Sequence, residues 1–338
     1  MVPLDHWHPV LAERALGRAP KKVLVCGEEI VLFRTASGRT GAAQHECPHR
    51  RMPLSEGRVS GEHLVCAYHG WRFTPDGDAT CPGMPGARMA ITTFDVAVRE
   101  GVIWLKSKTS NAALPDFDVD GRAPVCQLQM VFRAPLALVV DNLAEMEHTG
   151  EAHLYFGYDT DRMHEVELTT EVGDASVRVV ASGPQRRLPV LMDAARRFTG
   201  AASDDLFIDD LVFRFSPVHV ISDGYWVARR SGERRPEGLH SRVFLLPRTA
   251  TETELFGFYY LPHGSSRIAH LLRPLLKRII LLELERDRRV TEKVAERNNP
   301  AIEGMQLSRF DQPLLEIRKG IAQHYDRNLL TSRGAIQT

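Results

Sequence analysis

The sequence predicts an α+β protein of two domains, an all-β domain followed by a domain of strands and helices. Three observations support this prediction. Short β-type runs separated by glycine turns fill the first 108 residues. The polar stretch 107–124, with Pro115, Gly121 and Pro124, indicates a linker. Strand-like pairs and a long helical period follow it. We therefore expect domains at 1–115 and 116–338.

The composition excludes several classes of protein. The 338 residues are 43% hydrophobic and 25% charged, which is enough for two buried cores. Lys plus Arg and Asp plus Glu both number 43, so the net charge is zero and no nucleic-acid partner is expected. Charged residues and Pro274 interrupt the most apolar stretch, Leu271 to Leu284. With no signal-peptide core and an odd five cysteines, we expect a soluble, cytoplasmic protein without a disulfide framework.

The elements follow in order along the chain. In the first half a helical period occurs only in His6–Arg18, and the rest is β-type. The β-type runs are 22–26, 29–33 and 96–104, with turns at Ser37-Gly38, Asp76-Gly77 and Glu100-Gly101. The second half predicts a helix near 141–153, strand pairs 164–172/175–182 and 210–221/224–231, strands near 241–248 and 253–261, and a closing helix at about 267–297 with apolar positions Leu276, Ile280, Leu284, Val290 and Val294.

The most specific pattern in the first half joins two cysteines and two histidines. Cys47-Pro-His49 precedes Cys66-Ala-Tyr-His69 by sixteen residues. Structural zinc sites usually pair like with like, as C-x-x-C and H-x₃-H. Here each loop carries one thiolate and one imidazole, which suits a [2Fe–2S] cluster with two Cys on one iron and two His on the other. The sequence predicts a Rieske cluster, and Cys26, Cys81 and Cys126 are expected to be ordinary small apolar residues.

The second half carries a possible site for a mononuclear metal. His148 and His153 are five residues apart, about 140° on an unbroken helix, so both cannot face one ion unless the helix breaks near Gly150. Asp287 lies on the apolar stripe of the closing helix, where a carboxylate is costly unless it is paired or binds a metal. Two His and one carboxylate form the facial triad of non-haem Fe(II) oxygenases. Glu283, one turn earlier, is the rival ligand.

These segments together resemble a known family. Cys47-Pro-His-Arg, Leu54-Ser-Glu-Gly-Arg-Val, Cys66-Ala-Tyr-His-Gly-Trp and 76–85 resemble the N-terminal domain of Rieske non-haem iron oxygenases. The layout is similar to the branch that includes vanillate O-demethylase and dicamba monooxygenase. The resemblance implies a Rieske [2Fe–2S] domain and a helix-grip-like catalytic domain. It places His148 and His153 on the family's two-histidine motif and favours Asp287 over Glu283 as third ligand.

Glu145 departs from the family pattern, which usually has Asp three residues before the first iron-binding His. The resemblance implies that this acid bridges the iron site to the cluster of the neighbouring subunit. We expect Glu145 to accept hydrogen bonds from His148 and from His69 of an adjacent subunit. The alternative is a capping box with Asn142 at the N-cap and Glu145 at N3.

The resemblance implies a terminal oxygenase that uses O₂ to hydroxylate or demethylate a small organic substrate. No G-x-G-x-x-G fingerprint or second iron–sulfur motif is present, so electrons from NAD(P)H must come through a separate reductase, directly or through a ferredoxin. A homotrimer is also implied. The alternatives are a Rieske electron-transfer protein and a binding module, which contain two irons and none, whereas the oxygenase contains three.

The substrate is less defined by the sequence. Six residues of the C-terminal strands are candidates for a pocket, although core packing is the ordinary role of such side chains. They are Phe213, Phe215, His219, Trp226, Phe244 and Tyr259. Four nearby acids either attract a cationic substrate or form a solvated loop, namely Asp204, Asp205, Asp209 and Asp210.

Overall fold

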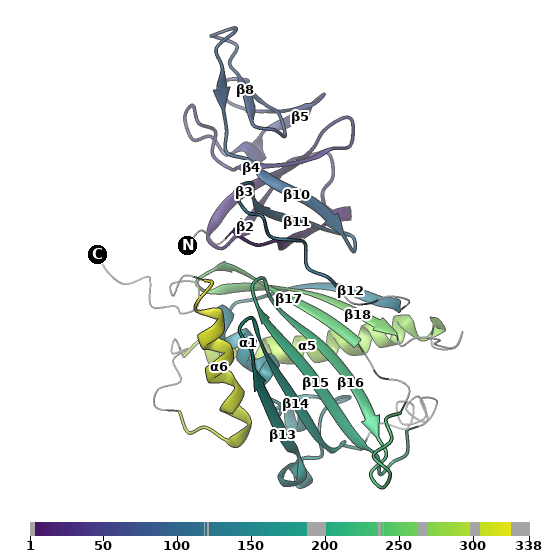
Figure 1. Cartoon of the computed structure of the whole chain (residues 1–338). Coiled ribbons are helices and arrows are strands. Elements are labelled where there is room, and N and C mark those ends of the chain that lie inside the picture. Colours follow the sequence, from purple (N-terminus) through teal and green to yellow (C-terminus); the bar gives the residue numbers. More distant parts are fainter. Residues whose placement is uncertain are drawn as a thin grey trace. The chain divides into compact units, whose positions relative to one another are not determined.

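The structure is a computed structural model that describes residues 4–117, 119, 122–187, 201–235, 238, 240–261, 270–297 and 305–325. The chain forms two compact units, Met1–Pro115 with Leu246–Thr249 and Asp116–Leu245 with Ala250–Thr338. The predicted α+β fold is confirmed (Figure 1). Gly121 of the predicted linker lies outside the described residues. In the part of the chain that the structure describes, no helix has the length and apolar character needed to span a membrane.

The first unit consists of three small antiparallel sheets with strand orders β1-β11-β10, β2-β3-β4 and β5-β6-β7-β8-β9. Its strands are β1 His8–Ala12, β2 Lys21–Val25, β3 Glu28–Arg34, β4 Thr40–Gln44, β5 Arg58–Ser60, β6 His63–Val65, β7 Arg72–Phe73, β8 Asp78–Thr80, β9 Met89–Ala90, β10 Phe94–Arg99 and β11 Val102–Ser107, and the 3-10 helices are Glu13–Ala15 and Leu54–Glu56. The predicted turn at Glu100-Gly101 joins β10 to β11 with positive φ at both residues, +51° and +68°.

Residues 6–18 were expected to carry a helical period, and that expectation is wrong. They form β1 and a single 3-10 turn. The reason is tertiary, because β1 pairs along its length with β11 and buries His8, Pro9 and Val10. Pairing with a distant strand overrides the local period.

The second unit is built on one antiparallel sheet of seven strands in the order β12-β18-β17-β16-β15-β14-β13 (Figure 1). Its strands are β12 Ala123–Phe132, β13 Glu167–Val172, β14 Ser176–Pro184, β15 Leu206–Phe215, β16 Val218–Val227, β17 His240–Thr249 and β18 Glu252–Leu261. Its helices are α1 Leu136–Ala144, α2 Thr149–Ala152, α5 Arg273–Ala295 and α6 Gln312–Ile321, with 3-10 turns at Thr160–Glu165 and Arg309–Asp311.

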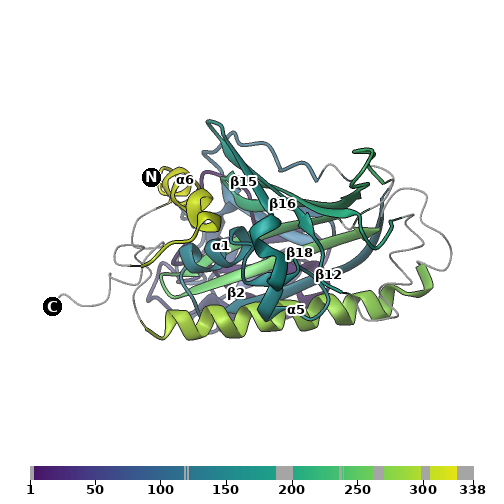
Figure 2. The ribbon, with the colours of Figure 1, turned by 90° about the horizontal axis from the view of Figure 1, so that it is seen from below.

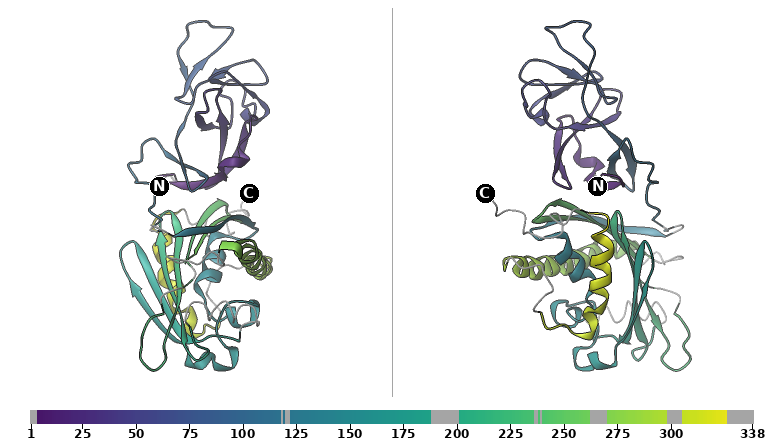
Figure 3. Two further views of the ribbon diagram at one scale, coloured as in Figure 1. Left: turned by 90° about the vertical axis from the view of Figure 1, so that its right-hand side faces the viewer. Right: turned by 60° about the vertical axis from the view of Figure 1, so that its left-hand side comes forward.

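The helices α1, α5 and α6 lie on one side of this sheet, which curves around them (Figure 3). Figure 2 shows α5 running along the edge formed by β12 and β18. Helix α6 packs on β14 and β15, where Gly320 lies so close to the ring of Phe215 that a Cβ would overlap it. Arg318 Nε donates to Asp141 Oδ1 of α1 at 2.8 Å and so ties the two helices together.

We call the side of the sheet that faces these helices the inner face. In β15 it carries Phe207, Asp209, Leu211, Phe213 and Phe215, because side chains alternate along a strand and Phe215 contacts α6. The antiparallel register places these residues beside Val177, Val179, Ala181 and Gly183 of β14 and Val218, Val220, Ser222, Gly224 and Trp226 of β16. The inner face is therefore mostly apolar, as the core side of a sheet should be.

The strand pair 210–221/224–231 was predicted with the wrong turn. The turn lies at Ser216-Pro217, and Asp223, expected at the turn, lies inside β16. Partners on β17 explain its place, because His240 Nδ1 and Arg242 Nη1 donate to Asp223 Oδ1 at 2.7 and 3.1 Å. A polar residue that signals a turn in isolation is held within a strand by these contacts.

Two helix predictions also need correction. The segment 141–153 is not one helix but the end of α1 and the single turn α2. The expected closing helix corresponds to α5, although 267–269 lie outside the described residues, and it is followed by α6. Of its predicted apolar stripe, Ile280 and Leu284 are buried, but Val290 and Val294 are 44% and 43% exposed. The helical period was right, while burial is restricted to the middle turns.

Candidate metal centres

Two loops of the first unit repeat the same hydrogen-bond pattern around a cysteine. The Cys47 N–H donates to the carbonyl five residues later, Met52, and the N–H of Arg51 donates back to Cys47. In the second loop, the Cys66 N–H donates to Trp71 and the N–H of Gly70 donates back to Cys66. The fourth residue after each cysteine has a positive φ, +54° at Arg51 and +69° at Gly70. Equivalent tight turns therefore present the two thiols.

The four predicted cluster residues divide by burial. Cys47 and Cys66 are 1% and 2% exposed, whereas His49 and His69 are exposed. The two imidazole rings have centroids 4.5 Å apart, and the His49 ring stacks on Trp71 at 5.2 Å. Burial raises the pKa of the Cys47 thiol, so a thiolate at this place needs a cationic partner. Two buried sulfur donors with two outer nitrogen donors fit a Rieske [2Fe–2S] cluster.

The remaining cysteines are free thiols outside these loops, as expected. Cys26 is buried, and Cys81 and Cys126 are partly buried. Burial raises the pKa of Cys126 to about 11, so this thiol is neutral near pH 7.

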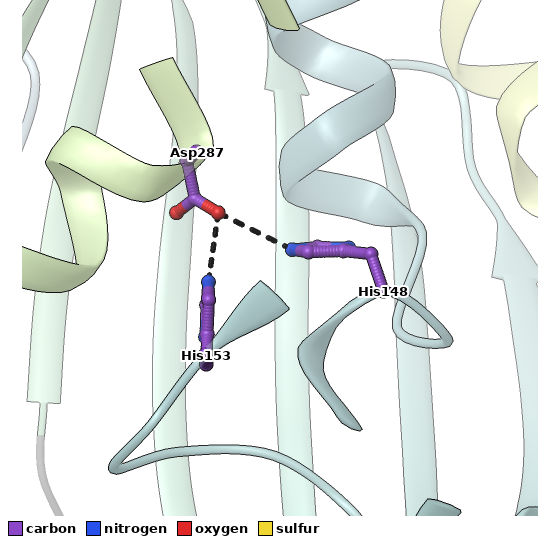
Figure 4. Close-up of side chains that lie close together, drawn as sticks. All are labelled: His148, His153 and Asp287. Atoms are coloured by element: carbon purple, nitrogen blue, oxygen red, sulfur yellow. Dashed lines mark hydrogen bonds and ion pairs between the residues drawn. The ribbon is translucent and has the colours of Figure 1, made fainter. Parts of the chain in front are cut away.

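In the second unit the helix that carries the two histidines is broken. Helix α1 ends at Ala144, the backbone is extended at Glu145, and His148 and His153 flank the single turn α2. His153 has an extended backbone with ψ at 153°, so its side chain does not follow the helical rotation. This break brings both imidazoles toward Asp287 of α5 (Figure 4).

The three side chains converge on one point. Asp287 Oδ1 lies 2.7 Å from His153 Nε2 and 3.4 Å from His148 Nε2. The two rings are nearly perpendicular, at 86°. Three donors bound to one ion at about 2.1 Å lie about 3 Å apart, so this spacing fits a shared metal ion. Among the residues that the structure describes, it is the one group of three or more ligating side chains within 4.8 Å of one another.

The electrostatics of these groups favour a bound cation. Burial alone lowers the pKa of His148, but its hydrogen bonds with Asp287 and Glu145 outweigh burial and raise that pKa to about 9. Burial alone raises the pKa of Asp287, but the two histidines outweigh it and lower that pKa. A proton on His148 therefore holds the place that a metal cation takes, and metal uptake releases it.

Glu145 sits at the break between α1 and α2, so the alternative capping box is wrong. Asn142 lies inside α1 and does not cap it. The carboxylate of Glu145 instead accepts from the backbone N–H groups of Glu147 and His148, the second at 3.1 Å. His148 Nδ1 lies 2.6 Å from the Glu145 carbonyl oxygen and 3.2 Å from its carboxylate. These bonds fix Nδ1 as the donor and leave His148 Nε2 toward Asp287.

Glu283, the rival ligand, lies beside the site without entering it. Its carboxylate is 3% exposed and accepts from the N–H groups of Leu154 and Tyr155 at 2.9 to 3.2 Å. Arg286 donates to the Ala152 carbonyl at 2.9 Å, and Arg186 donates to the carbonyls of Gly150 and His153. Charged side chains thus hold both ends of the turn. Sequence reasoning did not identify Arg186, because no local pattern marks its distant backbone partners.

The pocket candidates are mostly core residues, as expected. Phe213, Phe215, His219, Phe244 and Tyr259 are all buried. Trp226 is partly buried, and its Nε1 donates to Gln185 Oε1 at 2.9 Å. Of the acids, Asp205 pairs with Arg235 and Asp210 with Arg178, both at 2.7 Å, and Asp204 is exposed.

Comparison with known proteins gives the same two parts. The chain matches the Rieske [2Fe-2S] domain over residues 6–95 and the vanillate O-demethylase oxygenase C-terminal domain over residues 132–327. A Rieske domain ahead of such a domain defines the class of Rieske-type oxygenases. The second match covers more than half of the chain, and the chain belongs to the vanillate O-demethylase family of these enzymes. The resemblance noted from the sequence is confirmed.

Two curated relatives and one solved structure illustrate the similarity. The chain is 29% identical to dicamba O-demethylase, oxygenase component, of Stenotrophomonas maltophilia, over 76% of this chain and 74% of that protein. It is 31% identical to 4beta-methylsterol monooxygenase of Methylococcus capsulatus, but this match spans only 43% of each. The crystal structure of dicamba monooxygenase bound to 3,6 dichlorosalicylic acid has the same fold, with a TM-score of 0.79 at 22% identity over 95% and 97% of the two chains.

We expect Glu283→Ala to weaken iron binding without abolishing it. The change removes the acceptor of the Leu154 and Tyr155 N–H groups, which are only partly buried, so it costs at most about 1–3 kcal/mol of stability each. Loss of a group that orients a ligand lowers metal affinity about 10–100-fold. Titration of the apo-site with Fe(II), alongside urea unfolding, measures both effects.

Glu285→Ala is the matched control, because Glu285 lies on the same helix and pairs with Arg288 and Arg289. It should leave iron affinity unchanged. If Glu283→Ala lost all mononuclear iron while Asp287→Ala kept it, Glu283 would be the iron ligand and Asp287 the supporting acid, which would contradict the assignment.

Proposed function

We propose that the chain is the terminal oxygenase of a multicomponent system. It takes electrons from NAD(P)H through a separate reductase, directly or by way of a ferredoxin, and uses O₂ to hydroxylate or demethylate a small organic substrate. The observation that carries the proposal is the convergence of His148, His153 and Asp287 in the same chain as the two Rieske loops. An electron-transfer protein has no use for the second group.

In this proposal Cys47 and Cys66 hold one iron of the cluster, and His49 and His69 hold the other. The cluster supplies one electron at a time, and its two neutral imidazoles raise its reduction potential relative to an all-cysteine cluster. The burial of the thiols keeps water from the sulfur side, and the exposure of both histidines leaves the electron a short exit path. Trp71, stacked on His49, fixes the plane of that ring.

His148, His153 and Asp287 are proposed to hold one mononuclear Fe(II). An Fe(II) ion held by these three donors would keep open positions, and the chemistry it would supply is O₂ activation beside the substrate. The protein contributes orientation, because Glu145 fixes the His148 ring and the bonds from Glu283, Arg286 and Arg186 fix the turn between the histidines.

Demethylation is one form of this reaction. One oxygen atom of O₂ is inserted into a methyl C–H bond. The other oxygen atom takes up two electrons and two protons and is released as water. If the methyl group is attached to O or N, the hydroxymethyl product breaks at that bond and releases formaldehyde. The activities of the two relatives, an O-demethylase and a monooxygenase, support this class. Formaldehyde release coupled to O₂ uptake, with purified reductase and a substrate panel, tests it.

His148→Ala, His153→Ala and Asp287→Ala should each remove the mononuclear iron and leave the cluster's visible absorption. The reason is that the two groups of donors come from separate units of the chain. Iron analysis should fall from three to two per chain, as expected when one of two independent centres is lost. Loss of the cluster spectrum in all three variants would refute the two-site assignment.

Glu145 is proposed to bridge the two metal centres between subunits by accepting a hydrogen bond from the partner subunit's His69. Electrons would pass from the cluster to the iron across this bridge. Its side chain is 20% exposed, and a carboxylate has about four acceptor positions, so a position remains for an outside donor. Glu145→Ala should keep both metal centres but lower turnover at least about tenfold. The cluster should still become reduced, and the electron should then stall in a single-turnover experiment.

Glu145→Asp should restore part of the turnover, since it keeps the charged acceptor on a shorter side chain. If Glu145 only stabilises the turn before His148, a different outcome is expected. In that case Glu145→Ala lowers iron content or stability, and the electron transfer rate of the iron-loaded protein is unchanged.

We also propose a homotrimer in the cytoplasm. An interface that repeats head to tail closes into a ring, and each cluster then serves the iron of a neighbour. Sedimentation velocity at working concentration should give three chains per particle. A monomer that turns over at the same rate would contradict this arrangement.

A further inference from the structure

Asp209 is the one charged side chain on the inner face of β14, β15 and β16 among the residues described there. Its neighbours across the strands are Ala181 and Gly224. The next acid along β15, Asp210, points to the outer side and pairs with Arg178. A carboxylate among apolar side chains is unfavourable unless it has a partner.

In the described part of the chain, Asp209 forms no ion pair with an arginine or a lysine. The three other acids between residues 204 and 210 differ from it: Asp205 and Asp210 form ion pairs, and Asp204 is exposed. The hydroxyl of Tyr158 is the nearby donor, and it faces both the carbonyl of Ala181, at 2.9 Å, and the Asp209 carboxylate. One hydroxyl has one hydrogen, so most acceptor positions of Asp209 stay unfilled.

Aromatic rings lie next to Asp209 on the inner face. Asp209 remains partly exposed although Ala181 next to it is fully buried. A Cβ on Gly224, opposite Asp209, would lie 3.2 Å from the Phe207 ring and 3.8 Å from Asp209 Oδ1, so this ring and the carboxylate both border Gly224. The ring of Phe207 lies 5.9 Å from that of Tyr158 and 5.6 Å from that of Trp226.

Hydrogen bonds tie this part of the inner face to the loop that carries His153. Tyr158 follows His153 by five residues and donates to the carbonyl of Ala181, which lies opposite Asp209. Arg186, just after β14, donates to the His153 carbonyl. Asp209 therefore lies on the stretch of the inner face that is next to the His153 loop.

We infer that Asp209 is the polar anchor of the substrate and selects one with a hydrogen-bond donor, an ammonium or hydroxyl group, on an otherwise apolar body. This inference rests on the proposed oxygenase function. The substrate's donor fills an acceptor position of Asp209 that the chain leaves open, and the ring faces of Phe207 and Trp226 favour a cation. A carboxylate substrate is disfavoured, because two like charges repel where solvent is largely excluded.

Four probes with the same methoxyphenyl group test the inference: 4-methoxybenzylamine, 4-methoxybenzyl alcohol, 4-methoxytoluene and 4-methoxybenzoate. Equilibrium dialysis of the anaerobic, iron-loaded enzyme gives each dissociation constant without turnover. The amine and the alcohol should bind at least about tenfold more tightly than 4-methoxytoluene, as expected for one hydrogen bond to a charged group. The benzoate should bind most weakly, and the ratio of amine to alcohol identifies the favoured donor.

Asp209→Ala should abolish the preference for both donors while iron content and cluster absorption stay normal. If that variant does not fold, Asp209→Asn should lose the preference for the amine. Asp210→Asn is the matched control and should bind all four probes as the unchanged enzyme does. Tightest binding of the benzoate, equal binding of the probes, or a preference that survives Asp209→Ala would overturn the inference. Iron counting and formaldehyde release report separately on the proposed function.

Discussion

On α5, Asp287 lies within about one turn of Glu283 and Arg286, the two side chains that hold the backbone on either side of His153. Glu283 lies one turn before it and binds the N–H groups after His153, and the adjacent Arg286 binds the carbonyl before it. A single rigid helix therefore sets the position of the carboxylate and of the loop that must meet it. If α5 shifted, ligand and loop would move together, which preserves the spacing between Asp287 Oδ1 and His153 Nε2.

The two candidate centres handle charge in opposite ways. In the first unit the anionic thiols are buried and the neutral imidazoles are exposed, so the solvent-facing part of the group carries little charge. In the second unit all three donors are largely buried, and the shifted pKa values of His148 and Asp287 show that they stabilise a positive charge between them. The first arrangement suits exchange of electrons at a surface, and the second suits chemistry sheltered from water.

Acidic residues on the sheet of the second unit differ according to the face of the sheet on which they lie. Asp210 and Asp223 lie on the outer side, where arginine or histidine neighbours compensate them. The pKa of Asp223 shows the effect, because His240 and Arg242 overcome its burial and lower it to about 2. Asp209 faces inward, and burial raises its pKa to about 7 although Tyr158 and His153 act in the opposite direction. Adjacent residues of one strand thus have different chemistry, because each faces a different environment.

The sequence by itself predicted the two candidate ligand loops and the change from a strand-rich first half to a second half of strands and helices. Cys47, His49, Cys66 and His69 lie within 23 residues of one another, and short-range spacing and turn residues are enough to predict how such loops form. The paired strands were also predictable, because period-two patterns depend on local alternation. The family resemblance, more than the residue pattern, favoured Asp287 over Glu283.

Only the tertiary structure decided where the helices break and which polar groups find partners. The break after Ala144, the place of Asp223 inside β16 and the role of Glu283 all depend on partners far away in the sequence. The four acids at 204–210 look equivalent in the sequence, and only the register of β14, β15 and β16 separates Asp209 from the rest. The physical reason is that burial and hydrogen bonding are properties of the assembled face, and a local pattern carries no record of what packs against it.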